Sequence, residues 1–158
     1  MTSQTEIDQI EKHFTAAVPR EWFTGAPRVD VDEEEILCVG RLATRTEAVA
    51  FREATRAERV AIAEKAEPRF RRKVSWGIEQ DGRTVLFTTR SAPVMTRLRL
   101  PERAVLDTLV GAGVARSRSD ALAWCVKLVG RHQAEWLADL RDALVDVDRV
   151  RGEGPTPL

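Results

Sequence analysis

The sequence predicts an α+β protein, because helical and strand periodicities alternate along it. Apolar residues recur every three to four positions in residues 4–18, and residues 46–67 are rich in Ala, Glu and Arg without glycine or proline. Both features favour helices. On either side of Asp81-Gly82 the apolar residues alternate instead, which is typical of a β-hairpin. Helical patterns then return after residue 101.

The first ninety residues are expected to form a small helix-strand-helix-hairpin module. Pro19 ends the first helix, and residues 19–30 hold two prolines and a glycine, so they are expected to be a loop. The apolar run at residues 36–39 predicts a strand, and an acidic run precedes it. The helix over residues 46–67 ends before Pro68, and its expected buried stripe is Phe51, Ala54, Ala61 and Ile62.

The hairpin is expected to have strands at residues 73–79 and 83–89. Val74, Trp76 and Ile78 alternate with polar or small residues before the turn, and Val85 and Phe87 do so after it. Asp and Gly both tolerate the positive φ angles of a type I′ turn. The sequence therefore predicts a two-residue turn at Asp81-Gly82.

The segment from Val94 to Leu100 is expected to form a further strand, with one apolar face and one basic face. Successive side chains of a strand point to opposite sides. One side carries Val94, Thr96, Leu98 and Leu100, and the other side carries Met95, Arg97 and Arg99. Such a strand can pack on a core and still present hydrogen-bond donors outward. An alternative is a third strand of a monomeric meander in which both arginines are merely solvated.

Two helices are expected after this segment. Pro101 suits the first turn of a helix, and Gly111-Ala112-Gly113 ends it. The second helix is expected to begin at Ser117, with Asp120 three positions later in a capping-box arrangement. Its core face continues to Val129, and Gly130 interrupts the helical propensity.

The order of these elements resembles the ribbon-helix-helix family of dimeric DNA-binding regulators. The resemblance covers residues 93–130, about a quarter of the chain: strand, proline, short helix, glycine turn, then Ser-Arg-Ser-Asp opening a second helix. It implies an intertwined homodimer whose two strands pair antiparallel and enter the major groove. The implied function is sequence-specific transcriptional regulation, for example as a repressor.

The resemblance also assigns roles to individual residues. The implied base-reading residues are Met95, Arg97 and Arg99, and the implied phosphate-binding residues are Arg116, Ser117, Arg118 and Ser119. Arg71, Arg72 and Lys73 are candidates for additional DNA contacts. Met95 departs from the family pattern, which usually has a polar residue there. The motif also follows some ninety residues, whereas in many members it opens the chain.

The distribution of charge supports binding to a polyanion in the middle of the chain. The net charge is zero, but residues 68–131 hold 13 basic and 5 acidic side chains. Residues 1–67 hold 9 basic and 14 acidic side chains, and residues 132–158 hold 3 and 6. A basic centre between acidic flanks is what a local DNA-binding surface needs.

The expected organisation is a module at residues 1–90, a DNA-binding and dimerisation region at 91–151, and a disordered tail at 152–158. Residues 131–151 are expected to form one more helix with an apolar stripe and an acidic remainder. That helix, or the acidic first module, suggests an alternative function: an antitoxin-like or scaffold protein that binds a protein partner.

Other function classes have little support in the sequence. It holds no phosphate-binding glycine loop, no GxSxG and no HExxH, so it is not expected to be an enzyme, although a nucleic-acid enzyme remains a third alternative. Cys38 and Cys125 lie in separate apolar runs without metal-ligand spacing, so neither metal nor cofactor is expected. The chain shows no secretory signal or membrane-spanning run, and a cytoplasmic location is expected.

Overall fold

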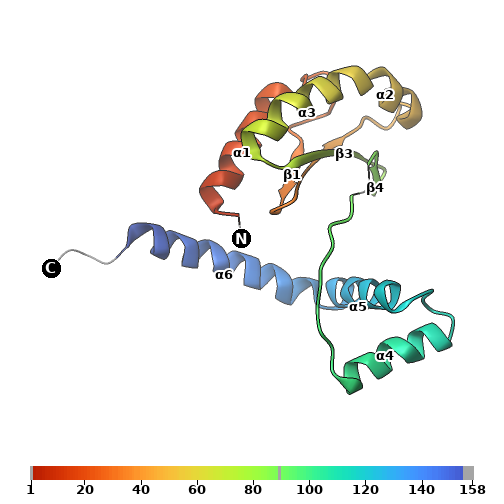
Figure 1. The fold of residues 1–158 in the computed structure, drawn as a ribbon. Coiled ribbons are helices and arrows are strands. Elements are labelled where there is room, and N and C mark those ends of the chain that lie inside the picture. Colours follow the sequence, from red (N-terminus) through yellow and green to blue (C-terminus); the bar gives the residue numbers. More distant parts are fainter. Residues whose placement is uncertain (1, 89, 155–158) are drawn as a thin grey trace. The chain divides into compact units, whose positions relative to one another are not determined.

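A computed structural model describes residues 2–88 and 90–154 of the chain, and it is a mixed α+β structure (Figure 1). The chain divides into two compact units, residues 1–92 and residues 93–158. The elements follow the order α1-β1-β2-α2-α3-β3-β4 in the first unit and α4-α5-α6 in the second. The predicted α+β class is confirmed.

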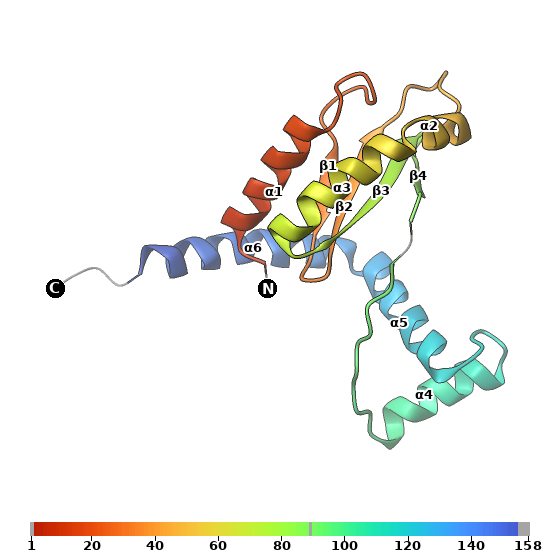
Figure 2. The same cartoon turned by 45° about the horizontal axis from the view of Figure 1, so that its top comes forward.

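The first unit is a four-stranded sheet with helices packed on one face (Figure 2). Its strands are β1 (Arg28–Val31), β2 (Glu35–Arg41), β3 (Lys73–Gln80) and β4 (Arg83–Leu86), in the spatial order β1-β2-β3-β4. β2 and β3 run parallel, whereas both outer pairs are antiparallel. The parallel pair requires a crossover connection, which α2 (Ala48–Ala54) and α3 (Arg56–Phe70) supply.

The core of the first unit lies between the sheet and the helices α1 (Gln4–Ala17) and α3. Ile10 and Phe14 of α1 are fully buried, as the helical spacing predicts. From the sheet, Ile36, Cys38, Trp76 and Ile78 face them. Burial raises the pKa of the Cys38 thiol to about 12, so this thiol is inert core rather than a reactive site.

The predicted hairpin is confirmed, with a two-residue turn. Gln80 pairs with Arg83 across the turn, and Asp81 and Gly82 have φ angles of 51° and 73°. Two consecutive positive φ angles define the type I′ turn that the Asp-Gly pair predicts. The second strand ends at Leu86, earlier than expected, and Thr89 lies outside the described residues.

Strand β1 was not predicted, because residues 19–30 were interpreted wholly as a loop. It is only four residues long, and Val29 and Val31 are its only apolar residues. The acidic run after it is the turn of a hairpin. The Asp32 carboxylate accepts hydrogen bonds from the backbone N–H groups of Glu34 and Glu35, at 2.8 and 2.7 Å. This Asx-type turn joins β1 to β2.

The single helix predicted over residues 46–67 is wrong in two respects. Thr55 breaks it: its φ and ψ are −91° and 0°, and its hydroxyl donates to the Phe51 carbonyl at 2.8 Å. The break shifts the buried face, so Arg59, Ala66 and Phe70 are buried, while Ala54 and Ala61 are exposed. The helix also continues past Pro68 to Phe70, whose ring packs on the core, and Arg71 ends it at φ 54°.

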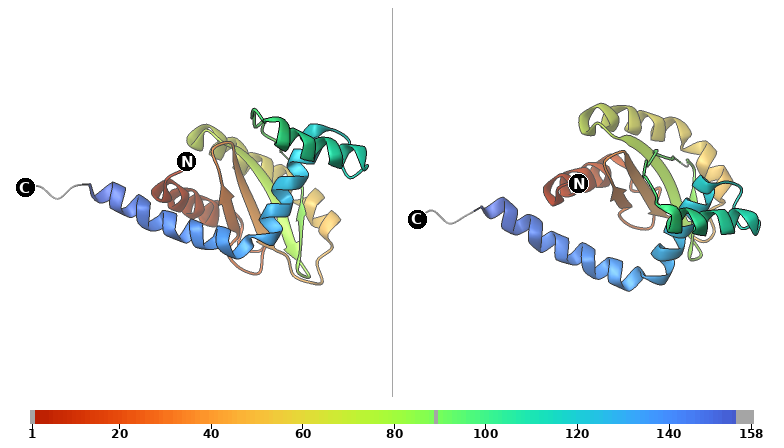
Figure 3. Two further views of the ribbon diagram at one scale, coloured as in Figure 1. Left: turned by 90° about the horizontal axis from the view of Figure 1, so that it is seen from below. Right: turned by 60° about the horizontal axis from the view of Figure 1, so that its bottom comes forward.

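The second unit consists of α4 (Leu100–Gly111), α5 (Arg118–His132) and α6 (Ala134–Glu153). The chain changes direction between α5 and α6, at Gln133 (Figure 3). Helix α5 passes through Gly130, so the glycine does not interrupt it. Residues 152–153, expected in a disordered tail, belong to α6, and residues 155–158 lie outside the described residues. Within the described part, no helix is long and apolar enough to span a membrane.

His13 gives the first unit a testable pH dependence. Burial lowers the pKa of His13 from its ordinary 6.5, and the Arg69 guanidinium, which donates to its Nδ1 at 3.3 Å, lowers it further. The fold therefore favours the neutral ring. Below pH 6.5 the unfolded chain gains a proton that the folded chain does not, so stability is full above this pH and falls below it.

The expected result is a fall in the free energy of unfolding between pH 6.5 and pH 5, measured by urea denaturation. A His13→Phe variant, which keeps a ring between Phe14 and Phe70, loses this dependence. The exposed His132 on α5 supplies the control, because His132→Gln keeps it. An unchanged slope in His13→Phe would contradict the assignment.

Candidate nucleic-acid interface

Residues 93–99 form an extended segment that belongs to no sheet of the described chain. The meander alternative is therefore wrong, because the sheet of the first unit ends with β4. The predicted strand needs a second chain as its hydrogen-bonding partner, so a single chain does not test it. Leu100, which was expected at the end of this strand, is the first residue of α4.

The side chains of the segment are far more exposed than those of a packed strand. Met95 is 98% exposed and Val94 is 87% exposed, whereas Leu98 is half-buried against the small core of the second unit. Arg97 and Arg99 are exposed, and within the described residues their side chains make no ion pair or hydrogen bond. Two free guanidinium groups thus lie two residues apart on an unpaired segment.

Arg103 holds the end of the segment in place. This residue of α4 donates from Nη1 to the carbonyl of Leu98 at 2.7 Å. Pro101 lies in the first turn of α4, as predicted, where its missing N–H leaves no intrahelical bond unmade. The role of Arg103 could not be predicted from the sequence, because an arginine in the first turn of a helix is usually an ordinary surface residue.

The start of α5 has the predicted cap. The Ser117 hydroxyl accepts from the backbone N–H of Asp120 at 3.2 Å, and the Asp120 carboxylate accepts from the N–H of Arg116 at 2.9 Å. That second bond holds the pKa of Asp120 below its ordinary value. In a capping box the Asp120 side chain would accept from the N–H of Ser117, but here it accepts from the N–H of Arg116, one residue before the cap. The N–H groups of Arg118 and Ser119 have no acceptor among the described residues, which leaves two donors for an anion.

Arg118 joins α5 to α4. Its Nε and Nη2 donate to the two carboxylate oxygens of Asp107 at 2.6 and 2.7 Å. The bidentate bond holds the pKa of Asp107 below its ordinary value. Both side chains are more than half exposed. Arg118 therefore already has a carboxylate partner in the free chain, and a DNA phosphate would have to share or replace it. Arg116 has a side chain 95% exposed, and within the described residues its side chain makes only a long contact of 3.7 Å to Asp120.

A shallow cavity of about 290 Å³ brings part of the two predicted residue sets together. Met95, from the base-reading set, lines it beside Arg118 and Ser119, from the phosphate-binding set. Arg97, Arg99 and Arg116 do not line it. The remaining lining residues are Val94, Thr96, Leu98, Arg103, Leu106 and Leu122.

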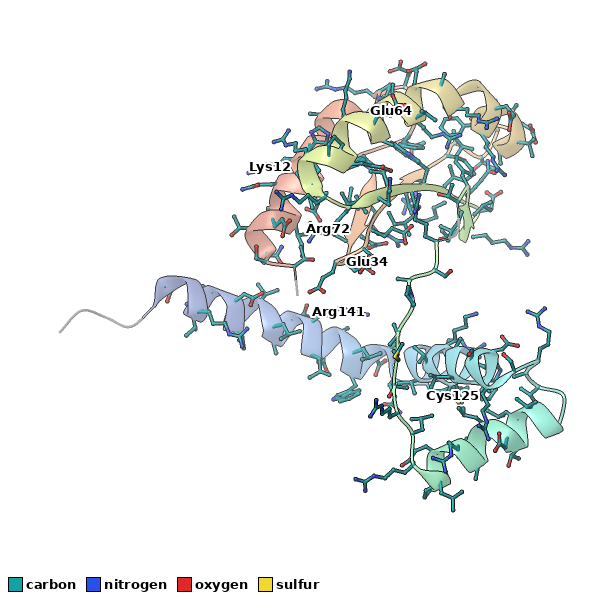
Figure 4. All side chains as sticks on the ribbon, viewed as in Figure 1. Lys12, Glu34, Glu64, Arg72, Cys125 and Arg141 are labelled. Carbon is teal, nitrogen blue, oxygen red and sulfur yellow. The ribbon has the colours of Figure 1, made fainter. Side chains whose placement is uncertain are left out.

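The second unit has a very small core for its size. Of its described residues, only Leu106, Ala115 and Ala121 are buried hydrophobic residues, and Cys125 is among those packed partly against them (Figure 4). Its helices nevertheless carry many exposed apolar side chains. On α4 and α5 these include Val105 (54%), Val126 (64%) and Val129 (49%). On α6 they are Trp136, Leu140, Leu144, Val145, Val147 and Val150. Large exposed apolar patches are typical of surfaces that bind another molecule.

The basic run at residues 71–73 lies in the first unit, and two of its three side chains are engaged there. Arg72, beside the start of α1, donates to Glu6 at 2.6 Å and to the carbonyls of Asp32 and Phe70 (Figure 4). Lys73 donates to Glu67 at 2.6 Å. Arg72 is therefore a structural residue that joins α1 to the sheet. Arg71, which is exposed, is the member of this run that remains available for a DNA contact.

Comparison with known proteins places both units in one family. Residues 8–86 match the family described as "Rv1265-like protein, N-terminal domain", and residues 99–151 match the family described as "Mb1296 C-terminal domain". The chain thus combines the N-terminal and C-terminal domains that these descriptions name, and it belongs to the Rv1265-like family. Neither description refers to ribbon-helix-helix proteins, so that resemblance stays a prediction.

The relatives are mycobacterial proteins without an assigned function. The chain is 54% identical over 164 residues to the uncharacterized proteins Mb1296 of Mycobacterium bovis and Rv1265 of Mycobacterium tuberculosis. The match covers 96% of this chain and 73% of each relative. No solved structure matches the chain significantly.

Proposed function

We propose that this protein is a dimeric, sequence-specific DNA-binding regulator. The observation that carries the proposal is the combination of an unpaired extended segment at residues 93–99 with exposed apolar faces on α4 and α5. A second copy of the chain would supply both a partner for the segment and a cover for the apolar faces. Its segment would pair antiparallel with the first, and its helices would cover the apolar faces, as in the ribbon-helix-helix arrangement.

In this dimer the two strands form a ribbon that enters the major groove, which is wide enough for it. Arg97 and Arg99 read base edges, because a guanidinium can donate two hydrogen bonds to guanine. Met95 supplies an apolar contact, for which a thymine methyl group is the matching partner. The residues at the start of α5, including Ser117 and Ser119, bind a phosphate through free N–H groups and the positive end of the helix dipole.

The experiment that tests this function is selection of bound fragments from a random duplex library at about 0.15 M salt, which weakens nonspecific contacts. The native chain is expected to enrich a palindromic site. Arg97→Ala/Arg99→Ala is expected to lose that enrichment while staying folded and dimeric. Arg45→Ala/Arg83→Ala, which removes two exposed arginines of the first unit, is the matched control and should enrich the same site.

A result without any enrichment, from a native chain that is folded and dimeric, would overturn the DNA-binding proposal. A loss of enrichment in the control variant equal to that in the test variant would show that total charge, and not the segment, provides the affinity.

Helix α6 favours a second candidate function, the binding of a protein partner. It has 20 residues and none of them is buried, although Trp136 and Leu140 are apolar residues four positions apart. If the dimer covers the stripe of Trp136 and Leu140, the fluorescence of Trp136 in the purified protein is expected to be that of a buried indole. An exposed indole in a proven dimer would instead favour the antitoxin-like or scaffold role.

A further inference from the structure

The first unit contains a cavity that the proposed DNA-binding function does not use. It has a volume of about 460 Å³, which lies in the usual range for small-molecule sites. The cavity lies between the α2-α3 crossover and the end of the hairpin. Its lining includes three arginines of the crossover, Arg52, Arg56 and Arg59, and the aromatic residues Trp76 and Phe87.

The central group of the cavity is a buried arginine without an acidic partner. Arg59 is only 7% exposed. Its Nε donates to the Thr55 hydroxyl at 3.1 Å and its Nη2 to the Arg52 carbonyl at 2.7 Å, and both acceptors are neutral. Its Nη1 donates no hydrogen bond within the described residues. Buried charges in proteins are normally paired, so an unpaired guanidinium in a cavity needs an explanation.

Further positive charge surrounds Arg59. The guanidinium of Arg59 lies 4.7 Å from the centre of the Phe87 ring, and that of Arg52 lies 5.7 Å from the same centre. Desolvation lowers the pKa of Arg59, the positive charges of Arg52 and Arg56 lower it further, and Glu53 opposes them. Three cations near one another repel, unless an anion binds between them.

The acidic residues of the cavity do not neutralise this end. Glu67 is committed to Lys73, which donates to it at 2.6 Å, and to the backbone N–H of Val74 at 3.2 Å. Glu64 is an exposed residue two helical turns along α3 from Arg56 (Figure 4). Glu53 is exposed on α2 and makes no ion pair within the described part of the chain. Of the lining residues that the structure describes, Glu53 is thus the one acidic residue beside the three arginines, and one carboxylate against three guanidinium groups leaves this end of the cavity positive.

The wall opposite the helices is apolar. Trp76 and Phe87, both less than 10% exposed, supply aromatic surface there, and Val74 extends it. Val60 and Ala63 add apolar surface from α3. A ligand that satisfies both parts of this site needs a planar anionic group of carboxylate size and an apolar body. A guanidinium fork matches a carboxylate because it can donate two parallel hydrogen bonds to it.

We propose that this cavity binds a small organic carboxylate, whose charged group lies on Arg59 and Arg56 and whose apolar body lies against Phe87 and Trp76. All of these residues belong to the first unit, so the proposal does not depend on the DNA-binding function. Phe87 and Thr88 lie near the end of the first unit, which extends to Ala92.

The test uses the full chain and measures binding by titration calorimetry with two carboxylates, flat naphthalene-2-carboxylate and linear decanoate. The matched neutral probes are naphthalene-2-methanol and decanol. At least one carboxylate is expected to bind with a dissociation constant below 1 mM and at least tenfold more tightly than its alcohol. Arg59→Gln is expected to weaken it at least tenfold.

Because Arg59 is buried, its replacement could act through the fold, so a second variant is needed. Arg56 is exposed, and its side chain makes no hydrogen bond or ion pair within the described residues. Arg56→Gln is expected to weaken binding severalfold with an unchanged melting temperature, and Arg83→Gln, on β4 outside the cavity, to leave it unchanged. The proposal is overturned if neither carboxylate binds, or if the alcohols bind as tightly as their carboxylates. It is also overturned if inorganic phosphate at equal concentration displaces the carboxylate, or if Arg56→Gln binds the carboxylate as tightly as the native chain does.

Discussion

The double substitution Val126→Glu/Val129→Glu is expected to convert the proposed dimer into a monomer and to abolish DNA binding. Both valines lie on α5 and are exposed in the single chain, at 64% and 49%. The substitutions therefore cost the isolated chain little. In the dimer, each would bury a carboxylate without a partner, at an effective cost of several kcal/mol per ion.

The size of this effect makes it easy to measure. About 4 kcal/mol raises a dissociation constant roughly a thousandfold. Sedimentation equilibrium should give the mass of one chain for the variant and of two chains for the native protein. Binding of the variant to the selected palindrome should be lost, because a ribbon needs two strands.

Val49→Glu/Val85→Glu is the matched control. These two valines are exposed at 66% and 49%, and they lie in the first unit, outside the proposed interface. The control adds the same charge and is expected to remain dimeric. A native chain that is monomeric at high concentration, or a Val126→Glu/Val129→Glu variant that stays dimeric, would show that α5 is not the interface.

Gly40→Ala is expected to destabilise the first unit by about 3 kcal/mol, near the upper end of typical overpacking effects. Gly40 lies near the end of β2 and is buried. A Cβ atom at this position would lie 2.2 Å from two atoms of the Phe23 ring, where no real carbon contact occurs. The ring cannot move aside easily, because it packs edge-on against Trp22 and tilted against Phe51.

Urea denaturation measures this prediction, and Gly25→Ala is its control. No atom lies within 4 Å of a Cβ built at Gly25, and this glycine is exposed with an ordinary backbone conformation. The control should change the free energy of unfolding by less than about 0.5 kcal/mol. Equal effects of the two substitutions would mean that the Phe23 contact does not limit position 40.

The local elements could be predicted from the sequence where one periodicity covered a whole segment. The spacing of three and then four residues over Ile7, Ile10 and Phe14 predicted α1, and Asp81-Gly82 predicted the hairpin turn, because both signals are contained in neighbouring residues. Strand β1 was missed because four residues with two valines do not reveal a period. Its place in the sheet depends on pairing with β2.

The candidate sites depend more on contacts between distant residues. The cap at Ser117 and Asp120 could be predicted, since its partners are three residues apart. The bond from Arg118 to Asp107 spans eleven positions and two helices, so no local pattern contains it. The burial of Arg59 was not predicted for a related reason. The buried stripe expected for an unbroken helix did not include Arg59, and the break at Thr55 shifts the buried face so that it does.

The length of chain between the two units limits how independent they can be. Phe87 is anchored in the first unit by its N–H, which donates to the Trp76 carbonyl at 2.8 Å, and the proposed reading segment is reached at Met95. Eight residues can span at most about 28 Å, at roughly 3.5 Å each. A dimer on DNA would therefore carry two first units within a few nanometres of one another, at an effective concentration on the order of millimolar. An attraction between first units whose dissociation constant lies below that concentration would be satisfied within one dimer, although it would be too weak to detect between separate first units in dilute solution.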